Sequence, residues 1–336
     1  MIRKFAVVLA GGRGERFWPL SQPHCPKQFL TIFDDKPLLT QTIERLGGYF
    51  KRSERLLIIP RELRALTRRY AGKENVVVEP VRRNTAPAIC LAGMVLHKKF
   101  GGGIMHVMPA DHLIKPKNAF ISALKYGQKL AENGYVVTYG IRPGRPETGY
   151  GYVKLGHRLG VSRNNRAYRG AGFTEKPNAV RARQYIKSGR YLWNSGIFTF
   201  CIKTILEEMK SFVPKVYRGV ERYAAGGVVS NFGRVPDISI DYGVMEKSRR
   251  LCVVEGNFSW DDVGSWLALD RYFTRDKKKN VLIGDARGID VKDSIMFSRD
   301  VPLRVHGVKG LIVIASPDGV LVCRKDRAQD LKKLLK

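Results

Sequence analysis

The sequence predicts an α/β fold with a mostly parallel sheet, followed by a small all-β unit. The chain has 336 residues, of which 44% are hydrophobic, enough for two domains with buried cores. Short β-branched runs alternate with helical patterns over the first two thirds, which is typical of a parallel sheet with helices on both faces. After residue 280, strands of four to six residues are separated by Gly, Asp and Pro turns.

The α/β part is expected to contain strands and helices in regular alternation. Buried strands are predicted at residues 5–9, 56–59, 76–78, 104–108 and 136–139. Apolar residues at three- and four-residue spacing predict helices at 38–50, 62–70, 86–100 and 119–133. The order then loosens, with strands expected at 152–155, 172–174 and 197–201 and helices around 180–187 and 205–209.

A shift in composition marks the predicted domain boundary. Four consecutive charges at 276–279 follow a helical stretch at 265–273. We therefore expect a large domain over residues 1–275 and a small all-β domain over 280–336 that ends in a basic amphipathic helix at 328–335. Such a small unit has too little core to be stable alone. Its strands at 311–314 and 320–322 look apolar on both faces, so we expect it to bury one face on the large domain or on a second copy, forming a homodimer.

The net charge of +30, from 60 Lys and Arg against 30 Asp and Glu, suits polyanionic partners. The basic residues are dispersed without aromatic interleaving, which argues against nucleic acid. No apolar run approaches the roughly 18–20 residues of a membrane span, and the apolar stretch at 5–10 is too short for a signal peptide. We expect a cytoplasmic protein that binds neither nucleic acid nor a membrane. Five widely spaced cysteines without a Cys-x-x-Cys pair argue against a disulfide framework or a zinc site.

The first predicted strand runs into the glycine-rich turn LAGGRGERFWPL, in which the backbone N–H groups of Gly11 and Gly12 can approach phosphates. The turn lacks the Gly-Lys-Ser/Thr of a P-loop and the third glycine of the dinucleotide fingerprint. Arg13, Arg16 and Lys27 place three cations near it, which favours a triphosphate. Each is alternatively a solvated surface charge.

Eight motifs follow one another from Leu9 to Trp266. They are LAGGRGERFWPLSQPHCPKQFL, RRNTAPAI, MPADHLI, ETGYGYV, FTEKP, WNSGIF, SIDYGVMEKS and WDDVGSW. The ordered set resembles the sugar-phosphate nucleotidylyltransferases and, more narrowly, the bacterial mannose-1-phosphate guanylyltransferases, also called GDP-mannose pyrophosphorylases. The resemblance implies a Rossmann-like nucleotidyltransferase domain followed by a β-helix-like domain. It also implies transfer of GMP from GTP to mannose 1-phosphate, giving GDP-mannose and pyrophosphate.

Two carboxylates are candidates for a metal site. Asp111 follows the strand at 104–108, at the edge where open α/β sheets bind ligands. A carboxylate beside a triphosphate suits Mg²⁺, although Asp111 is alternatively the cap of the next turn. The resemblance implies a second ligand from the motif Trp-x-Asp-x-Gly, which falls on Asp262, with Asp261 as the alternative. Mg²⁺, or another divalent cation, is the expected cofactor.

The predicted sugar-phosphate site comes from three motifs. By resemblance, Glu175 accepts hydrogen bonds from sugar hydroxyls and Lys176 contacts the sugar phosphate. Adjacent residues of an extended strand point to opposite sides, which would divide the two tasks. Asn194 offers both a donor and an acceptor. Gly149 allows close approach of the backbone, and Tyr150 either stacks on the sugar or belongs to the core.

Recognition of guanine requires acceptors for its N1 and N2 donors. Glu79, after the strand at 76–78, and the turn of Asn84, Thr85 and Ala86 are the candidates. Asn84 or Thr85 is alternatively only the N-cap of the next helix.

The expected catalysis is positioning and charge neutralisation, because the attacking sugar phosphate is already anionic. The catalytic residues expected are Arg16, Lys27, Asp111, Lys176 and Asp262. Two other functions remain open. One is a sugar-1-phosphate nucleotidylyltransferase that uses glucose 1-phosphate with UTP, dTTP or ATP, and the other is a basic nucleic-acid-binding protein.

Overall fold

The computed structural model describes residues 2–162 and 165–335, which form two compact units. The first unit consists of Met1–Gly11 and Thr42–Trp260, and the second of Gly12–Gln41 and Asp261–Lys336. The units divide the chain differently from the boundary expected at residues 275–280. The segment Gly12–Gln41, which the sequence places inside the large domain, clusters with the C-terminal residues.

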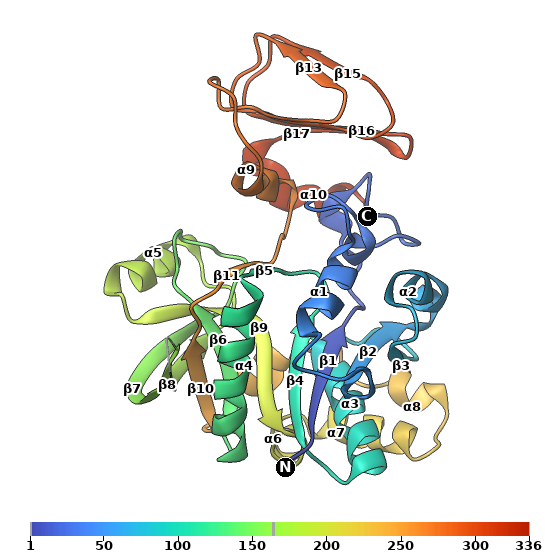
Figure 1. Ribbon diagram of the computed structural model, residues 1–336, viewed down its shortest axis with the longest axis vertical. Helices are drawn as coiled ribbons and strands as arrows, with labels where there is room; N and C mark the ends of the chain where they lie inside the picture. The colour runs from blue at the N-terminus through green and yellow to red at the C-terminus, as the bar shows by residue number, and fades with distance from the viewer. Residues whose placement is uncertain (1, 163–164, 336) are drawn as a thin grey trace. The chain divides into compact units, whose positions relative to one another are not determined.

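The first unit is built on a nine-stranded sheet in the order β3-β2-β1-β4-β9-β6-β10-β8-β7 (Figure 1). The strands are β1 Lys4–Leu9, β2 Arg55–Pro60, β3 Asn75–Glu79, β4 Ile104–Pro109, β6 Val136–Ile141, β7 Tyr152–Ser162, β8 Asn165–Thr174, β9 Tyr191–Cys201 and β10 Leu251–Glu255. Strands β8 and β9 run antiparallel to their neighbours, whereas the others share one direction. The sheet is therefore mostly parallel, as predicted.

Helices cover both faces of this sheet. They are α2 Arg64–Ala71, α3 Thr85–Phe100, α4 Lys117–Glu132, α5 Ala179–Ser188, α6 Ile202–Phe212, α7 Pro214–Ala224 and α8 Val229–Gly233, and α1 Leu38–Leu46 crosses the boundary between the units. Phe5 and Val7 of β1 share a core with α3, α6 and α7. The opposite face is covered by α4, where Tyr139 packs against Gly127. Alternate residues of the central strands therefore enter two separate cores.

The predicted elements of the first unit are observed with shifted ends. The helix expected at 38–50 ends at Leu46, because a turn follows in which Gly48 has a φ of 83°. The stretch at 62–70 begins with a 3₁₀ turn before α2. Sequence patterns missed α7, α8 and β10. They also missed the short paired strands β5 Leu113–Lys115 and β11 Ser259–Asp261.

The second unit contains the all-β part of the chain. Its strands are β12 Val281–Ile283, β13 Ala286–Ile289, β14 Ile295–Ser298, β15 Leu303–His306, β16 Leu311–Ser316 and β17 Gly319–Arg324. Strands β12, β14 and β16 stack in parallel, as do β13 and β15, so successive chain segments coil like a β-helix. Strand β17 closes the larger sheet in antiparallel fashion. The predicted β-helix-like unit is confirmed, and its terminal helix is a 3₁₀ segment at Lys325–Asp330 followed by α10 Leu331–Leu334.

Residues 320–322 place apolar side chains on both faces of β17, as predicted, and one of these faces is left uncovered by the described residues of this chain. Leu321 is buried, whereas Val320 and Val322 are 61% and 60% exposed. Strand β17 lies at the edge of its sheet, and alternate side chains point outward there.

Within the second unit, the β strands pack against residues assigned by sequence to the large domain. The indole ring of Trp266 lies 5.0 Å from the ring of Phe17 and 5.4 Å from that of Phe297. Its Nε1 donates to the carbonyl of Trp18 at 3.0 Å. The helical stretch expected at 265–273 is a 3₁₀ turn at Trp266–Ala268 followed by α9 Leu269–Tyr272. The small β unit therefore gains core by packing on Gly12–Gln41 and on this stretch.

Candidate active site

Glu79 and Gly11 lie together where β3 and β1 end in the first unit. A Cβ atom on Gly11 would stand 3.9 Å from Oε2 of Glu79. Glu79 is 5% exposed, and its Oε1 accepts a hydrogen bond from the backbone N–H of Arg83 at 3.3 Å. Burial raises the pKa of Glu79 to about 7, although this bond and the charge of Arg82 act to lower it. The carboxyl therefore changes its charge near neutral pH.

The turn before α3 is held by its own side chains. Asn84 is the N-cap of α3, with Oδ1 accepting from the backbone N–H of Thr85 at 2.9 Å and Nδ2 donating to Asp237 at 3.0 Å. Oγ1 of Thr85 accepts from the backbone N–H of Ile240 at 2.9 Å, and Ala86 is fully buried. The capping alternative for Asn84 is thus observed, and both side chains also anchor the segment around residue 240.

Asp111 follows β4 and lies beside a histidine that no prediction used. Its Oδ1 is 3.9 Å from Nε2 of His112. Nδ1 of His112 accepts a hydrogen bond from the indole N–H of Trp260 at 3.0 Å. Because an indole nitrogen can only donate, a neutral His112 carries its proton on Nε2, the atom nearer Asp111. Trp260 also contacts the ring of Tyr150 edge-on at 5.0 Å.

Glu175 and Lys176 contact each other instead of pointing to opposite sides. Nζ of Lys176 is 2.7 Å from Oε1 of Glu175, and the Glu175 side chain is 8% exposed against 56% for Lys176. The expectation that the two side chains point to opposite sides is wrong, because β8 ends at Thr174 and Lys176 has a φ of 47°, outside the extended region. Burial acts to lower the pKa of Lys176, but the hydrogen bond and charge of Glu175 outweigh it and raise the pKa.

The structure places the other predicted sugar residues around β9. Asn194 is buried in that strand, and its Nδ2 donates to Oδ1 of Asp241 at 2.8 Å. Tyr150 is buried, with edge-on ring contacts to Trp193 and Trp260, so its ring belongs to the core. The backbone N–H of Gly149 donates to Glu147 at 3.2 Å.

The glycine-rich turn belongs to the second unit from Gly12 onward. Gly14 is the position that requires glycine, since its φ is 66° and a Cβ there would stand 2.3 Å from Cβ of Lys27. Lys27 is buried, and its Nζ donates to the main-chain carbonyl of Asp262 at 2.5 Å. The fold of this unit thus brings together Lys27 and the WDDVG motif, which are far apart in the sequence.

The two arginines of the turn are more accessible. The Arg13 side chain is 70% exposed and lies 3.6 Å from Oε1 of Glu15. Nη1 of Arg16 donates to Oε1 of Gln329 at 2.6 Å. Both contacts are exposed or half-exposed, so they are weak competitors for a phosphate group.

Asp261 and Asp262 have different surroundings. Asp261 is 6% exposed, and its carboxylate accepts from Nε and Nη2 of Arg271 at 2.6 and 2.8 Å and from the backbone N–H of Val263 at 2.8 Å. Asp262 is partly exposed. The first carboxylate holds its own unit together, which supports the choice of Asp262 as the metal ligand.

The donor chemistry fits a magnesium ion that arrives with its nucleotide. Over residues 2–162 and 165–335, no group of three or more His, Cys, Asp or Glu side chains is arranged to hold a metal ion. Mg²⁺ needs no such cage, because it binds through one or two carboxylates together with phosphate oxygens and water. Asp111 and Asp262 supply hard oxygen donors of this kind.

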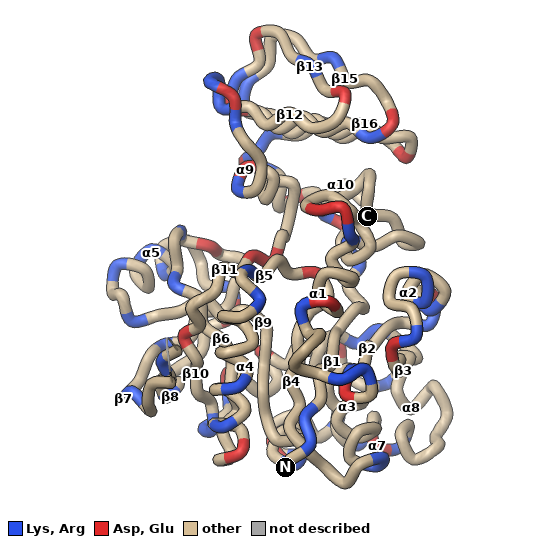
Figure 2. Tube along the Cα trace, in the orientation of Figure 1, with Lys and Arg blue, Asp and Glu red and all other residues tan. Residues whose placement is uncertain are grey.

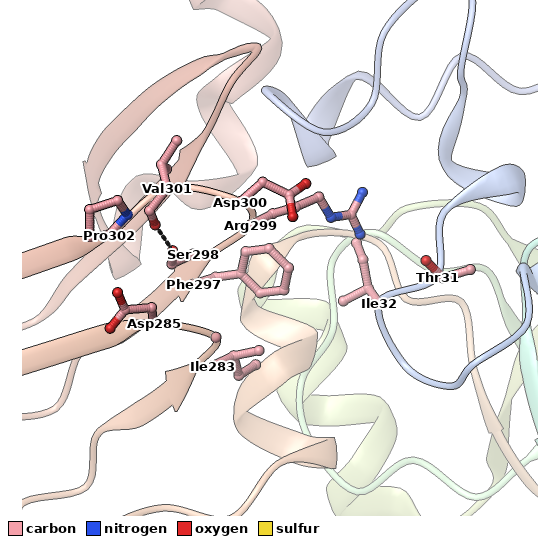
Figure 3. A pocket seen from close by; sticks show the side chains of 11 residues that line it. Thr31, Ile32, Ile283, Asp285, Phe297, Ser298, Arg299, Asp300, Val301 and Pro302 are labelled. Atoms are coloured by element: carbon pink, nitrogen blue, oxygen red, sulfur yellow. Dashed lines mark hydrogen bonds between the residues drawn. The ribbon is translucent and has the colours of Figure 1, made fainter.

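A separate cavity in the second unit contains none of the predicted site residues. It measures about 610 Å³ and is lined by Thr31, Ile32, the ends of β12 and β14 and the turn that includes Arg299 and Asp300 (Figure 3). Figure 2 shows the many Lys and Arg residues spread along both units. No helix in the described part of the chain is both long and apolar enough to cross a membrane.

Comparisons with known proteins agree with the fold. The nucleotidyl transferase family profile matches residues 5–279, and a profile for the mannose-phosphate isomerase/GMP-like β-helix domain matches residues 284–336. The chain belongs to the nucleotidyl transferase family. The predicted enzyme class and fold class are confirmed.

Named relatives of this enzyme match nearly the whole of this chain. It is 37% identical to the mannose-1-phosphate guanylyltransferase of Klebsiella pneumoniae over 97% of this chain and 72% of that protein. It is 36% identical to the alginate biosynthesis protein AlgA of Pseudomonas aeruginosa, over 98% of this chain and 71% of that protein. A crystal structure described as a mannose-1-phosphate geranyltransferase from Thermus thermophilus superposes with a TM-score of 0.89 and 41% identity, covering 99% of this chain and 98% of that one.

Sequence reasoning missed four residues of the candidate site. They are Gly14, His112, Asp241 and Trp260. All four lie inside motifs that the sequence analysis quoted, so the signal was present. Their roles depend on side-chain partners from distant segments, which a motif alone does not specify.

Proposed function

We propose that this enzyme transfers GMP from GTP to α-D-mannose 1-phosphate, giving GDP-mannose and pyrophosphate. The observation that carries the proposal is the cluster of Glu175, Lys176, Asn194 and Asp241, in which carboxylates and an amide adjoin an ammonium group. Such a set suits a ligand with several hydroxyls and one phosphate. The names of relatives that match nearly the whole of this chain support the choice of mannose and guanine.

The reaction is an in-line displacement. A phosphate oxygen of mannose 1-phosphate forms a bond to the α-phosphorus of GTP while the bond from that phosphorus to the pyrophosphate oxygen breaks. The attacking oxygen is already anionic, so no residue has to remove a proton. Lys176 holds the sugar phosphate in line by charge, and Glu175 accepts hydrogen bonds from the sugar hydroxyls.

The cations of the second unit hold the leaving group. Arg16 exchanges its hydrogen bond to Gln329 for a phosphate oxygen, and Arg13 leaves its loose contact with Glu15. Lys27 likewise exchanges its hydrogen bond to the carbonyl of Asp262 for one to a phosphate oxygen. Cations placed beside the leaving group stabilise the charge that develops on pyrophosphate.

Asp111 and Asp262 are the residues that would hold Mg²⁺, or another divalent cation. When bound, the ion neutralises phosphate charge as a Lewis acid. Near Asp111, His112 presents its Nε2 side to the carboxylate and Trp260 fixes the ring.

Guanine recognition is assigned to the edge where β1 and β3 end. Ionised Glu79 accepts from the N1 and N2 donors of guanine, and Gly11 and Gly12 allow the backbone to approach the nucleotide. Asn84, Thr85 and Ala86 shape the turn beside it. UTP and dTTP carry a single ring donor at N3, so they would leave part of this carboxylate without a partner.

We also propose that the enzyme is a cytoplasmic homodimer formed through its β unit. The exposed side chains of Leu282, Ile289, Val320 and Val322 support an interface there. Light scattering should give twice the mass of the chain, and Val320→Lys/Val322→Lys should give a folded monomer. A monomeric wild type would contradict the dimer.

The function is tested by a product assay that uses mass detection. Four nucleoside triphosphates are offered in parallel with mannose 1-phosphate and glucose 1-phosphate. GDP-mannose should form fastest. A faster reaction of glucose 1-phosphate with UTP, dTTP or ATP would replace the proposal with the alternative nucleotidyl transfer, and no nucleotide sugar from any pair would overturn both.

A further inference from the structure

Asp241 bonds to one predicted sugar-binding residue and lies within the electrostatic influence of two others, although its motif carried no assigned role. Its Oδ1 accepts the hydrogen bond from Asn194, and Glu175 and Lys176 are the charged groups that act on it. It begins the short π-helical turn Asp241–Met245 and is partly accessible. The carboxyl therefore belongs to the same cluster, on a residue that is not fully buried.

The surroundings of Asn194 determine what its amide can offer. Its Oδ1 accepts from Oγ1 of Thr138 at 2.6 Å and from the backbone N–H of Gly196 at 3.3 Å. The amide oxygen thus faces the protein, whereas Nδ2 faces Asp241. Asn194 can present only a donor to a sugar, in contrast to the donor and acceptor expected from the sequence. The acceptors that this cluster offers to sugar hydroxyls are therefore the carboxylates of Glu175 and Asp241.

The segment that carries Asp241 is pinned to the start of α3. Its three hydrogen bonds are Asn84 to Asp237, the N–H of Ala86 to the carbonyl of Ile238, and the N–H of Ile240 to Thr85. A carboxyl on a segment fixed at three points is already in place before a ligand binds. The same contacts tie the sugar cluster to the turn assigned to the nucleotide.

The charges around Asp241 favour a hydrogen-bond donor. Desolvation raises the pKa of Asp241 to about 7, and the charge of Glu175 adds to this effect. Lys176 and the bond from Asn194 act in the opposite direction. A further donor stabilises the ionised carboxylate, as a sugar hydroxyl would.

We propose that Asp241 determines sugar specificity. Its carboxylate accepts a hydrogen bond from one ring hydroxyl of the sugar phosphate and holds the Asn194 amide so that it donates to another. This role rests on the proposed function and assigns to Asp241 a share of sugar recognition beside Glu175.

The test compares Asp241→Asn and Asp241→Ala with the wild type on mannose 1-phosphate and its 2-, 3-, 4- and 6-deoxy analogues. We expect kcat/KM for mannose 1-phosphate to fall about 10- to 100-fold, with the KM for GTP changing less than about threefold. For the one analogue that lacks the hydroxyl bound by Asp241, the kcat/KM values of variant and wild type should differ by less than about threefold. A merely structural role would lower kcat/KM for all five sugar phosphates by the same factor.

Asp237→Asn is the matched control, because Asp237 lies on the same segment but contacts Asn84 instead of the sugar cluster. It should leave the KM for mannose 1-phosphate within about twofold. Thermal unfolding checks each variant, and near-isosteric Asp241→Asn keeps the test valid if the alanine variant fails to fold. Equal losses on all five sugars, or no loss, would overturn the role of Asp241. A wild type without product overturns the proposed function itself.

Discussion

The two compact units hold their candidate site residues in different ways. In the first unit, side chains from distant elements bond to one another, as Asn194 does to Asp241 and Asn84 to Asp237. In the second unit, Lys27 bonds to a main-chain carbonyl, Arg13 is largely exposed, and the side-chain bond of Arg16 to Gln329 is exposed to solvent. The first arrangement fixes the directions of donors and acceptors, whereas the second supplies positive charge near a backbone that glycine leaves open.

This difference indicates a division of work. Directed side chains discriminate between ligands that differ by one hydroxyl or one amino group, because a mismatch leaves a buried polar group unpaired. Cations on a glycine-rich turn stabilise phosphate charge whatever sugar or base is attached. Substitutions of these directed side chains should therefore change selectivity, and substitutions of the cations on the glycine-rich turn should lower activity with every sugar and base.

The metal ligands should show the largest effects, because loss of either carboxylate weakens binding of the ion that neutralises the phosphates. Asp111→Asn and Asp262→Asn should each lower kcat/KM by about 10³-fold at saturating Mg²⁺, as loss of a Lewis-acid ligand does. Asp261→Asn should leave most activity and instead lower the free energy of unfolding by about 1–3 kcal/mol, since Arg271 loses its bidentate partner. Kinetics and thermal unfolding on the three variants measure this. Equal kinetic losses at Asp261 and Asp262 would refute the assignment.

A smaller effect separates the nucleophile side from the leaving-group side. Lys176→Ala should lower kcat/KM for mannose 1-phosphate about 100-fold, with less change in the KM for GTP. Arg16→Ala should act mainly on GTP and, in the reverse reaction, on pyrophosphate. Gln329→Ala is the control, because it removes only the neutral partner of Arg16. Steady-state kinetics in both directions decide, and an unaltered sugar-phosphate dependence in Lys176→Ala would contradict the division.

The strands of the first unit were predictable because their signal is local. Runs such as those at β1 and β4 are buried on both faces and read as continuous apolar stretches. Helix α7 was missed although it is amphipathic, because its buried Val216 and Val220 are isolated among polar, charged and glycine residues in the sequence. The end of α1 was also missed, since it depends on a turn with positive φ.

The sequence predicted which residues belong to the candidate site but not which side chains contact one another. The motifs identified Glu175, Lys176 and Asn194, yet the contact between Glu175 and Lys176 depends on a backbone angle that no spacing rule gives. The different surroundings of Asp261 and Asp262 depend on Arg271, which lies outside the motif. The clustering of Gly12–Gln41 with the C-terminal strands has no local signal, because it arises from packing between Phe17, Trp266 and Phe297.

The smallest expected effect concerns pH and guanine. Glu79 has its pKa raised to about 7 by burial, with Arg83 and Arg82 opposing and Asp237 and Glu62 adding to the shift. Between pH 6 and 8 its ionised fraction rises about tenfold, so the KM for GTP should fall as pH rises. Glu79→Gln should lose this pH dependence of the KM for GTP. The ratio of the wild-type KM to the variant KM at each pH removes the contribution from ionisation of GTP itself. Inosine triphosphate, which lacks the N2 amino group, should show a weaker dependence in the wild type.

Stability gives an independent measurement of the same group. A carboxyl whose folded pKa is raised from 4.5 to about 7 keeps its proton in the folded state while the unfolded chain loses it. Its contribution to stability is therefore complete below pH 4.5 and is lost as the pH rises towards 7. Glu79→Gln removes this loss, so its melting temperature relative to the wild type should increase from pH 5 to pH 8. A difference that stays constant with pH would show that Glu79 is ionised throughout, and the pH-dependent KM for GTP would then need another group.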